Sequence, residues 1–288
     1  MKDAWGKWGD DDEIGALNLI GEREVCAAVR LVRQGRVINL AQEISAVMSL
    51  PPHRAGVTHF MGRDGGDYAA GARRPGGFQF AEDTVVLPLH TGTHVDALCH
   101  CWYDDKLYNG FSGDGVRSSG AQLLGVHTMP PVVARGLLLD FVALTGAPLA
   151  DGTPIDPQIL QAALARTGTD LTPGDVVLLR TGWHEAQGQT APDYNAEPGL
   201  DLDAALVLAE AGVAMVGADN FAVEVLPFAP GTVFPVHQRL IRDFGIPLLE
   251  GLVLQPLAEA GATAFMFMAA PLPIKGATGS PITPIAVL

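Results

Sequence analysis

Cysteine and basic residues are both scarce in this chain of 288 residues. The three cysteines, Cys26, Cys99 and Cys101, are odd in number and show no paired framework, so we expect a reducing, cytoplasmic setting. Lys and Arg total 18 against 32 Asp and Glu, which leaves a net charge of -14. Such a charge repels phosphate backbones and anionic lipid surfaces, so we expect no nucleic acid and no membrane as partners.

Long apolar runs are also missing. The stretches of highest hydrophobicity, such as residues 262–271, fall well short of the ~20 residues that a membrane-spanning helix needs. The first residues, Met1 to Trp5, lack the apolar core of a signal peptide. Hydrophobic residues nevertheless make up 48% of the chain, enough for a substantial core. We therefore expect one enzyme-sized unit over residues 1–288.

Short strand-like runs alternate with helical patterns along the chain. This alternation predicts a mixed α/β fold rather than an all-β sandwich. Strand character is found at residues 37–44, 85–89, 137–142, 176–180, 214–218 and 263–268, and helical spacing at residues 22–34, 156–165 and 202–211.

Residues 51–77 are rich in Gly, Arg and Pro and are interpreted as a long loop. A loop of this length more often covers a functional site than merely connects two elements, so we expect a substrate lid. Apolar or flat side chains there could contact an organic substrate. The candidate substrate-binding residues are His59, Phe60 and Met61, joined by Phe80 and Trp102.

The carboxyl-terminal segment, residues 270–288, contains prolines at positions 271, 273, 281 and 284 and a single charged residue, Lys275. Proline in a helix interior removes a hydrogen bond and clashes with the preceding turn, so the segment cannot be an ordinary helix. Its apolar end is unlikely to remain in water. We expect an extended tail that lies over its own domain or over a neighbouring subunit.

Residues 90–100 contain an unusually high density of side chains that can bind a metal. His90, His94, Asp96 and His100 fall within eleven positions, although the whole chain has only 8 histidines. All four positions are even, so an extended segment would direct them to one side. A straight strand would separate His90 from Asp96 by roughly 20 Å, so the chain must bend, and Gly92 can supply the bend.

A second pair of possible ligands lies far downstream. His237 and Glu250 are each flanked by apolar residues, which suggests burial. Buried ionisable groups need partners. From the residues alone, Glu250 would be paired with an arginine such as Arg239 or Arg242.

The eleven-residue segment resembles the signature H-x-G-T-H-x-D-x-P-x-H of the cyclase-like metal-dependent hydrolases, a family that includes bacterial kynurenine formamidase and isatin hydrolase. Only the proline differs, being Leu98 here. The resemblance extends over nearly the whole chain and implies a swivelling β/β/α fold and a homodimer or homotetramer. It also implies that His237 and Glu250 complete the metal site.

This ligand set predicts Zn²⁺ or Mn²⁺, one or two ions per chain, because both metals suit N and O ligands. His90, His94 and Asp96 would hold one ion, and His100 would act as a catalytic base, as a ligand or as both. In a two-metal site Asp96 would bridge, with His100, His237 and Glu250 on the second ion.

The expected reaction is attack of a metal-bound hydroxide on the amide of a small molecule: an aryl formamide, a cyclic imide or a lactam. Two alternatives stay open. One is a lyase or cyclase that stabilises an enolate through the same metal, and the other is a non-catalytic metal-binding protein. Cys99 and Cys101 are interpreted as small buried hydrophobes, and Asp219 as an orienter of a ligand histidine or as a turn residue.

Overall fold

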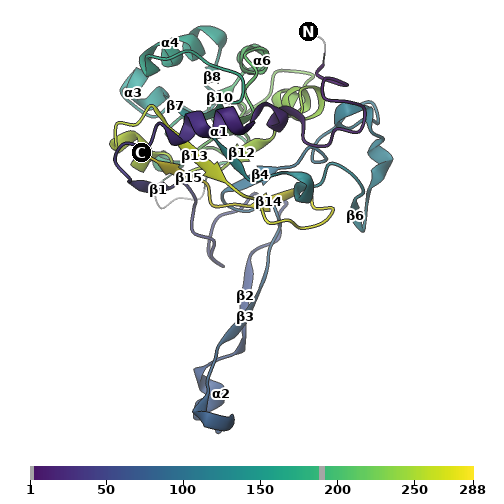
Figure 1. Ribbon diagram of the computed structural model, residues 1–288, viewed down its shortest axis with the longest axis vertical. Coiled ribbons are helices and arrows are strands. Elements are labelled where there is room, and N and C mark those ends of the chain that lie inside the picture. Colours follow the sequence, from purple (N-terminus) through teal and green to yellow (C-terminus); the bar gives the residue numbers. More distant parts are fainter. Residues whose placement is uncertain (1–2, 188–191) are drawn as a thin grey trace.

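The computed structural model describes residues 3–187 and 192–288, and within them one large sheet organises the body of the molecule (Figure 1). This sheet is mixed, with β7, β9, β11 and β12 parallel and the strands at both ends antiparallel to their neighbours. In spatial order its nine strands are β1 (Val37–Asn39), β15 (Ile285–Val287), β13 (Ala264–Ala269), β7 (Val132–Asp140), β9 (Val176–Arg180), β11 (Met215–Ala218), β12 (Leu248–Glu250), β4 (His94–Asp96) and β14 (Gly279–Pro281).

Helices and short strand pairs surround the sheet. Helices α4 and α1 both pack against β7, and Figure 1 shows α3, α4 and α6 gathered at one end of the body. The helices are α1 (Glu22–Val29), α2 (Gly65–Ala69), α3 (Phe141–Thr145), α4 (Pro157–Thr167), α5 (Trp183–Ala186), α6 (Leu202–Glu210), α7 (Pro235–His237) and α8 (Gln255–Glu259), with a π-helical turn at Gln238–Asp243 and 3₁₀ turns at Gly15–Leu19, Pro75–Gly77, Tyr108–Gly110, Gly113–Gly115 and Val126–Thr128. The strand pairs are β2 (Thr58–Arg63) with β3 (Glu82–Val86), β5 (Val116–Arg117) with β6 (Gly120–Ala121), and β8 (Pro154–Ile155) with β10 (Gly199–Leu200).

The prediction of a mixed α/β fold is confirmed. Strand β9 occupies residues 176–180 as expected, and four of its five residues are buried, because a central parallel strand is covered on both faces. Helices α4 and α6 are capped at their amino ends by Asp156 and Asp201, each of which accepts a hydrogen bond from a backbone N–H of the first turn. None of the described helices is both long and apolar enough to cross a membrane.

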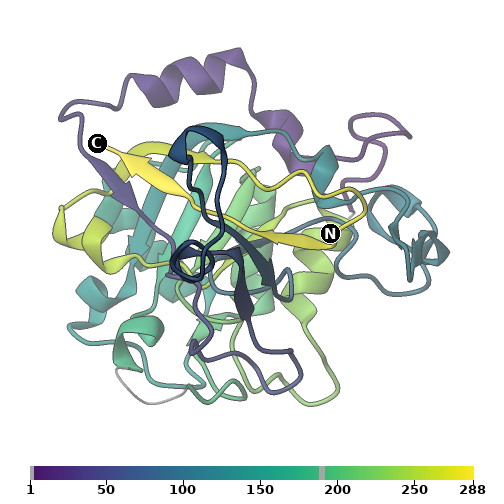
Figure 2. The ribbon, with the colours of Figure 1, turned by 90° about the horizontal axis from the view of Figure 1, so that it is seen from below.

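The clearest departure from the sequence prediction is the segment expected to be a long loop. Strands β2 and β3 pair with each other and, with α2 between them, form an arm that projects from the body (Figures 1 and 2). We call residues 58–86 the arm. The β-branched and aromatic residues of these segments favour strands, and Gly62 lies at the irregularity in the pairing between Met61 and Arg63.

The carboxyl-terminal tail is extended and belongs to the sheet. Strand β14 lies beside β4, and β15 lies between β1 and β13. The final residue, Leu288, is buried and its backbone pairs with Gln34, Gly35 and Arg36. The tail therefore contributes a strand to each end of the sheet, one of them next to the segment that carries the histidines.

Candidate metal centre

The histidine segment and the downstream pair meet at the β4–β12 edge of the sheet. Strands β4 and β12 are antiparallel neighbours, and their register places Glu250 directly opposite His94. Gly92 has a φ of +58°, a conformation that side chains rarely adopt, and this bend turns the chain just before β4. His237 reaches the same place from α7. The structure thus brings all six predicted ligand residues into one cluster.

Distances between side-chain atoms divide the cluster into two groups that share Asp96. The first group is His90, Asp96 and His100, and the second is Asp96, His237 and Glu250; in each, the potential ligand atoms lie within 4.8 Å of one another. His94 lies between them, with Nε2 at 3.1 Å from Glu250 Oε2 and 3.8 Å from Asp96 Oδ1. The sequence analysis predicted that His94 shares one ion with His90, and that His100 shares a second ion with His237 and Glu250. In the structure His100 lies with His90 instead, whereas the sharing of Asp96 by both groups agrees with the prediction.

Hydrogen bonds outside the cluster orient three of the imidazoles. His94 Nδ1 is 2.9 Å from the carbonyl oxygen of Gly92, and His237 Nδ1 is 2.6 Å from Glu224 Oε1. A proton on each Nδ1 leaves the Nε2 lone pair free to face the cluster. His90 uses its other nitrogen, since its Nε2 lies 3.1 Å from Thr278 Oγ1 and its Nδ1 faces Asp96.

The inward-facing atoms fit a metal. His90 Nδ1, His94 Nε2 and both carboxylate oxygens of Asp96 are buried and have no hydrogen-bond partner among the described residues. His90 Nδ1 approaches Asp96 Oδ1 to 2.7 Å without the geometry of a hydrogen bond. Buried polar atoms left unpaired are costly, and a donor set of imidazoles and carboxylates suits a divalent cation. Cluster geometry and donor chemistry therefore both indicate a divalent metal centre.

Electrostatics within the cluster favour anionic carboxylates. Burial opposes the charge of Asp96, but the positive potential of His100, His90 and His94 outweighs it and holds the pKa of this carboxyl well below its usual range. His100 behaves differently, because burial lowers its pKa to about 4 and the neighbouring imidazoles His90 and His237 act in the same direction. A neutral His100 can donate a lone pair to a metal or accept a proton.

The alternative partners of Glu250 are excluded. Arg239 and Arg242 both pair with Asp243, at 2.6 and 2.8 Å, whereas Glu250 contacts His94 and His237. Asp219 is not an orienter of a ligand histidine. Its carboxylate accepts hydrogen bonds from the backbone N–H groups of Thr181 and Gly182 and from the Thr181 hydroxyl, which fixes the turn after β9.

Of the two cysteines of the segment, Cys99 is buried in the core as predicted, whereas Cys101 is only partly buried against it. Burial raises the pKa of Cys99 to about 12 and that of Cys101 to about 11, so neither thiol ionises readily near neutral pH. A thiolate is the form that binds zinc. A zinc site built on Cys99 and Cys101 is therefore disfavoured.

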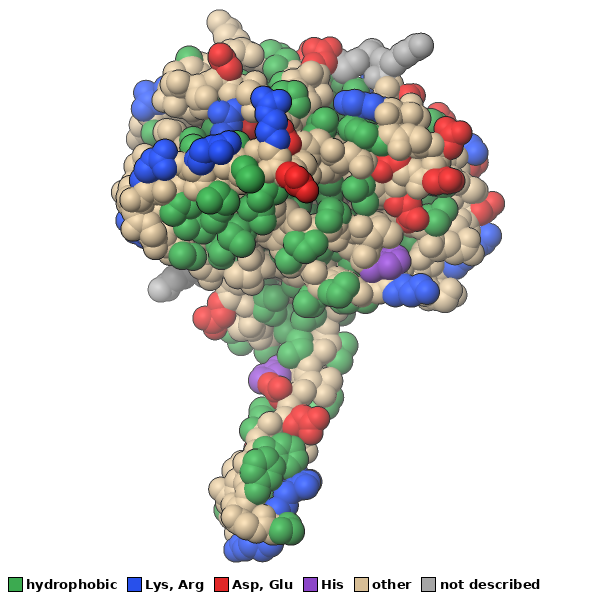
Figure 3. Space-filling view, viewed as in Figure 1, with side chains coloured by type: hydrophobic (Ala, Val, Ile, Leu, Met, Phe, Trp, Pro, Cys, Tyr) green, Lys and Arg blue, Asp and Glu red, His purple; other side chains and the backbone are tan. Residues whose placement is uncertain are grey.

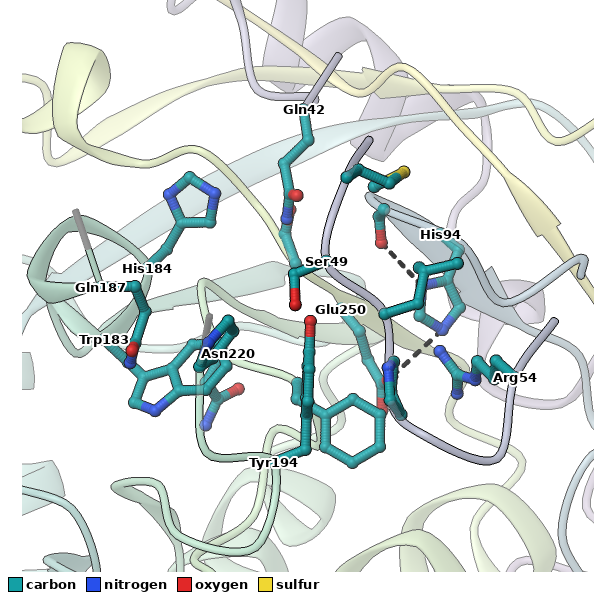
Figure 4. A pocket seen from close by; sticks show the side chains of 17 residues that line it. Gln42, Ser49, Arg54, His94, Trp183, His184, Gln187, Tyr194, Asn220 and Glu250 are labelled. Carbon is teal, nitrogen blue, oxygen red and sulfur yellow. Dashed lines mark hydrogen bonds and ion pairs between the residues drawn. The ribbon is translucent and has the colours of Figure 1, made fainter. Parts of the chain in front are cut away.

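A cavity of about 230 Å³ opens beside the cluster, with His94 and Glu250 in its wall (Figure 4). Aromatic side chains form another part of the wall: the ring centroids of Tyr194 and Phe221 are 5.3 Å apart, and those of Trp183 and Tyr194 are 6.1 Å apart. Figure 4 shows Arg54 next to His94, and Trp183 with His184 farther from it. The cavity thus has charged side chains next to the cluster, and its aromatic wall extends from there to Trp183.

None of the five predicted substrate-binding residues lines this cavity. His59, Phe60, Met61 and Phe80 lie on the arm, where His59 pairs with Asp83 of the facing strand at 2.7 Å. Trp102 packs against Gly113 and is 39% exposed. For a single chain the predicted contacts are wrong, because strand pairing carries these side chains away from the body instead of folding them over it.

The sequence prediction missed Glu224 and the residues that line the cavity. Besides its contact with His237 Nδ1, Glu224 accepts hydrogen bonds from the backbone N–H groups of Val236 and His237, and it is 1% exposed. Its neighbours Ala222, Val223 and Val225 are apolar, and a carboxylate within such a run is a sequence signal for a buried, partnered acid.

Known proteins resemble this chain over most of its length. A family model described as a putative cyclase matches residues 37–225, which include the histidine segment and Glu224. The chain is 30% identical over 219 residues to the isatin hydrolase of Roseibium aggregatum, covering 73% of this chain and 75% of that protein. It is 28% identical over 204 residues to the kynurenine formamidase of Salinibacter ruber, covering 69% and 76%.

Solved structures share the fold. A crystal structure described as a novel cyclase matches with a TM-score of 0.91 and 37% identity over 100% of both chains. Isatin hydrolase A from Ralstonia solanacearum matches with a TM-score of 0.65 at 24% identity, over 87% of this chain and 91% of that one. The curled sheet and its surrounding helices are therefore common to these proteins.

Proposed function

The chain belongs to the putative cyclase family, whose curated relatives are hydrolases, and on this premise we propose that it cleaves the amide bond of an aryl formamide, cyclic imide or lactam. The observation that carries the proposal is the meeting of two carboxylates and four imidazoles, with unpaired buried atoms, beside an aromatic cavity whose wall includes His94 and Glu250. Zn²⁺ or Mn²⁺ would suit these ligands.

A bound divalent ion would polarise a carbonyl group and lower the pKa of water, which are the two things amide hydrolysis needs. The chain itself supplies the other functions. His90, His94, Asp96, His237 and Glu250 would hold the ion, and His100, a member of the first group, would take a proton from water and return it to the leaving nitrogen. The aromatic wall takes up the flat part of the substrate and excludes water.

Metal analysis combined with a substrate panel tests the proposal. Purified protein is expected to contain at least one Zn or Mn per chain and to hydrolyse one of N-formylkynurenine, isatin or a simple imide, with activity lost on chelation and regained on adding metal back. Formate release identifies a formamidase, and ring opening without a released acid identifies a cyclic amide as substrate. Full activity without metal, or a metal-loaded protein inactive on the whole panel, contradicts the proposal.

We also propose that the chain forms a homodimer or homotetramer. Supporting this is the arm, which exposes large apolar side chains and has only one buried residue, Tyr68, among those of α2, β2 and β3 (Figure 3). A two-stranded ribbon by itself is only marginally stable in water. Packing against a second copy of the chain would cover it. A cytoplasmic location without nucleic-acid or membrane partners remains a prediction from composition.

A further inference from the structure

Arg54 is exceptional among the less exposed arginines of the described chain. Arg135, Arg180, Arg239 and Arg242 each lie within 3.0 Å of a carboxylate oxygen, and Arg63 on the arm lies 3.9 Å from that of Asp67. Among the described residues, no carboxylate oxygen lies within 4.0 Å of a side-chain nitrogen of Arg54. A half-buried guanidinium that has no anionic partner is energetically unfavourable, and a bound ligand with a negatively charged group would supply that partner.

The position of Arg54 places this free charge in the cavity. One N–H group of Arg54 donates to the carbonyl oxygen of His90, which ties the guanidinium to the chain that carries the metal-ligand residues. The guanidinium carbon lies 5.3 Å from the centre of the Phe221 ring. A guanidinium has five N–H donors, so the tether to His90 leaves others for a ligand.

The remaining cavity wall offers no competing positive charge outside the cluster. Burial lowers the pKa of His184, which keeps this imidazole neutral, and the other described lining residues include no lysine and no second arginine. Burial raises the pKa of the Tyr194 hydroxyl, and the positive charge of Arg54 opposes that shift. The positive charge of Arg54 therefore acts on Tyr194 in the aromatic wall of the cavity.

From this geometry, and resting on the proposed hydrolase function, we infer that Arg54 is a specificity-determining residue that binds a carboxylate on an aromatic ligand. The ring contacts Phe221 and Tyr194, and the carboxylate pairs with the guanidinium at the end of the cavity next to His94 and Glu250. A planar guanidinium fork matches a carboxylate with two parallel hydrogen bonds.

The carboxylate has two possible sources. Either the substrate already carries it, or hydrolysis produces it: the oxygen of water bonds to the carbonyl carbon, the C–N bond breaks, the nitrogen takes a proton and the new acid loses one. In a ring-opened product this carboxylate stays on the aromatic molecule, directly beside the reacting position. Both sources present the same group to Arg54.

Binding of benzoate and of its neutral counterpart benzamide to the purified, metal-loaded chain tests the inference by calorimetry. Replacing Arg54→Met is expected to weaken benzoate about tenfold to a hundredfold, since a hydrogen-bonded charge is lost, while benzamide changes less than about twofold. Arg54→Lys should bind benzoate with an affinity between those of the unaltered chain and Arg54→Met. Higher salt should reduce the difference in benzoate affinity between the unaltered chain and Arg54→Met. Arg30→Met, at an exposed position at the end of α1, is the matched control and should bind both compounds as the unaltered chain does.

Metal content is measured in every variant, because loss of the His90 contact could disturb the cluster. An equal loss of benzoate and benzamide binding with metal retained, or no loss of either, overturns the inference. So does metal loss in Arg54→Met if Arg54→Lys retains metal and binds benzoate no better than Arg54→Met.

Kinetics then separate the two sources. If the carboxylate belongs to the substrate, Arg54→Met raises KM for carboxylate-bearing amides about tenfold or more and leaves neutral amides unaffected. If it arises by hydrolysis, KM for a neutral cyclic amide is unchanged and inhibition by its ring-opened product weakens. A chain that hydrolyses the panel with metal but shows neither pattern keeps the proposed function and loses this inference, whereas a chain without metal-dependent hydrolysis loses the proposed function itself.

Discussion

A histidine lies 2.7 Å from an aspartate both in the candidate metal cluster and on the arm. The two pairs differ in burial and in hydrogen bonding, and so in the role that each can have. Asp96 is 1% exposed, its contact with His90 lacks hydrogen-bond geometry, and further imidazoles converge on it. Asp83 and His59 are 55% and 48% exposed and form an ordinary hydrogen bond between β2 and β3. An exposed pair contributes about 0–1 kcal/mol, whereas the buried atoms of His90 and Asp96 lack hydrogen-bond partners, and a bound cation would compensate for them.

The largest effect is expected from changing the shared carboxylate. Asp96→Asn removes a ligand from both groups at once, so metal binding and hydrolysis should fall below detection. Asp83→Asn makes the same chemical change in the exposed pair and should leave both intact. Elemental analysis and turnover of the two variants measure the contrast, and equal metal content in both would place the metal elsewhere.

Individual histidines are expected to show how many ions bind. His94→Ala should abolish metal binding at the site predicted for His90, His94 and Asp96. If His100 is chiefly a base, His100→Ala should retain metal and lose activity, since proton transfer by a positioned side chain supplies roughly 10²–10⁴-fold in rate. Metal stoichiometry and turnover are measured together. Equal metal loss in both variants favours two ions that share Asp96.

An intermediate effect is expected at Glu224, which touches His237 and not the ion. Glu224→Gln weakens the orientation of the imidazole, and loss of such a contact to a ligand histidine typically lowers metal affinity 10–100-fold. Competition with a coloured chelator measures that affinity. Glu259→Gln, an exposed helix position, is the control, and equal affinities in the two variants would show that Glu224 only braces the backbone of α7.

Removing the arm is expected to change assembly without changing the metal centre. Thr58 pairs with Val86, so a short Gly/Ser linker can replace the residues between them. Light scattering should show a dimer or tetramer for the intact chain and a smaller species for the shortened one, with equal metal per chain. A strict monomer in both cases would contradict self-association, and loss of metal would show that the arm supports the cluster.

The smallest effect is expected from two side chains of the arm. Phe60 and Met61 are 51% and 44% exposed, and burying them in an interface would stabilise it through apolar area. Phe60→Ala with Met61→Ala should therefore raise the dissociation constant of the assembly while metal content stays the same. Sedimentation at several concentrations measures this. A raised KM with unchanged assembly would return these residues to the substrate chamber.

Much of the candidate site could be predicted from the sequence because its signals are local. Four ligand-type residues at even positions within eleven, with a glycine between the first two, specify a bent extended segment that presents them together. The regular elements were predictable where periodicity is strong, as in β9 and α4. The arm was not, because glycine and proline near the tip obscured the strand pattern of the two flanking segments.

The sequence by itself determined which residue types are available to the metal and which way the extended chain directs them, since alternation along a strand is a property of the backbone. Only the tertiary structure decided the rest: that β12 lies beside β4 and sets Glu250 opposite His94, that Glu224 orients His237, and that no carboxylate of the described residues pairs with Arg54. These contacts join residues distant in sequence, and their energy comes from packing the whole sheet, which no local pattern encodes.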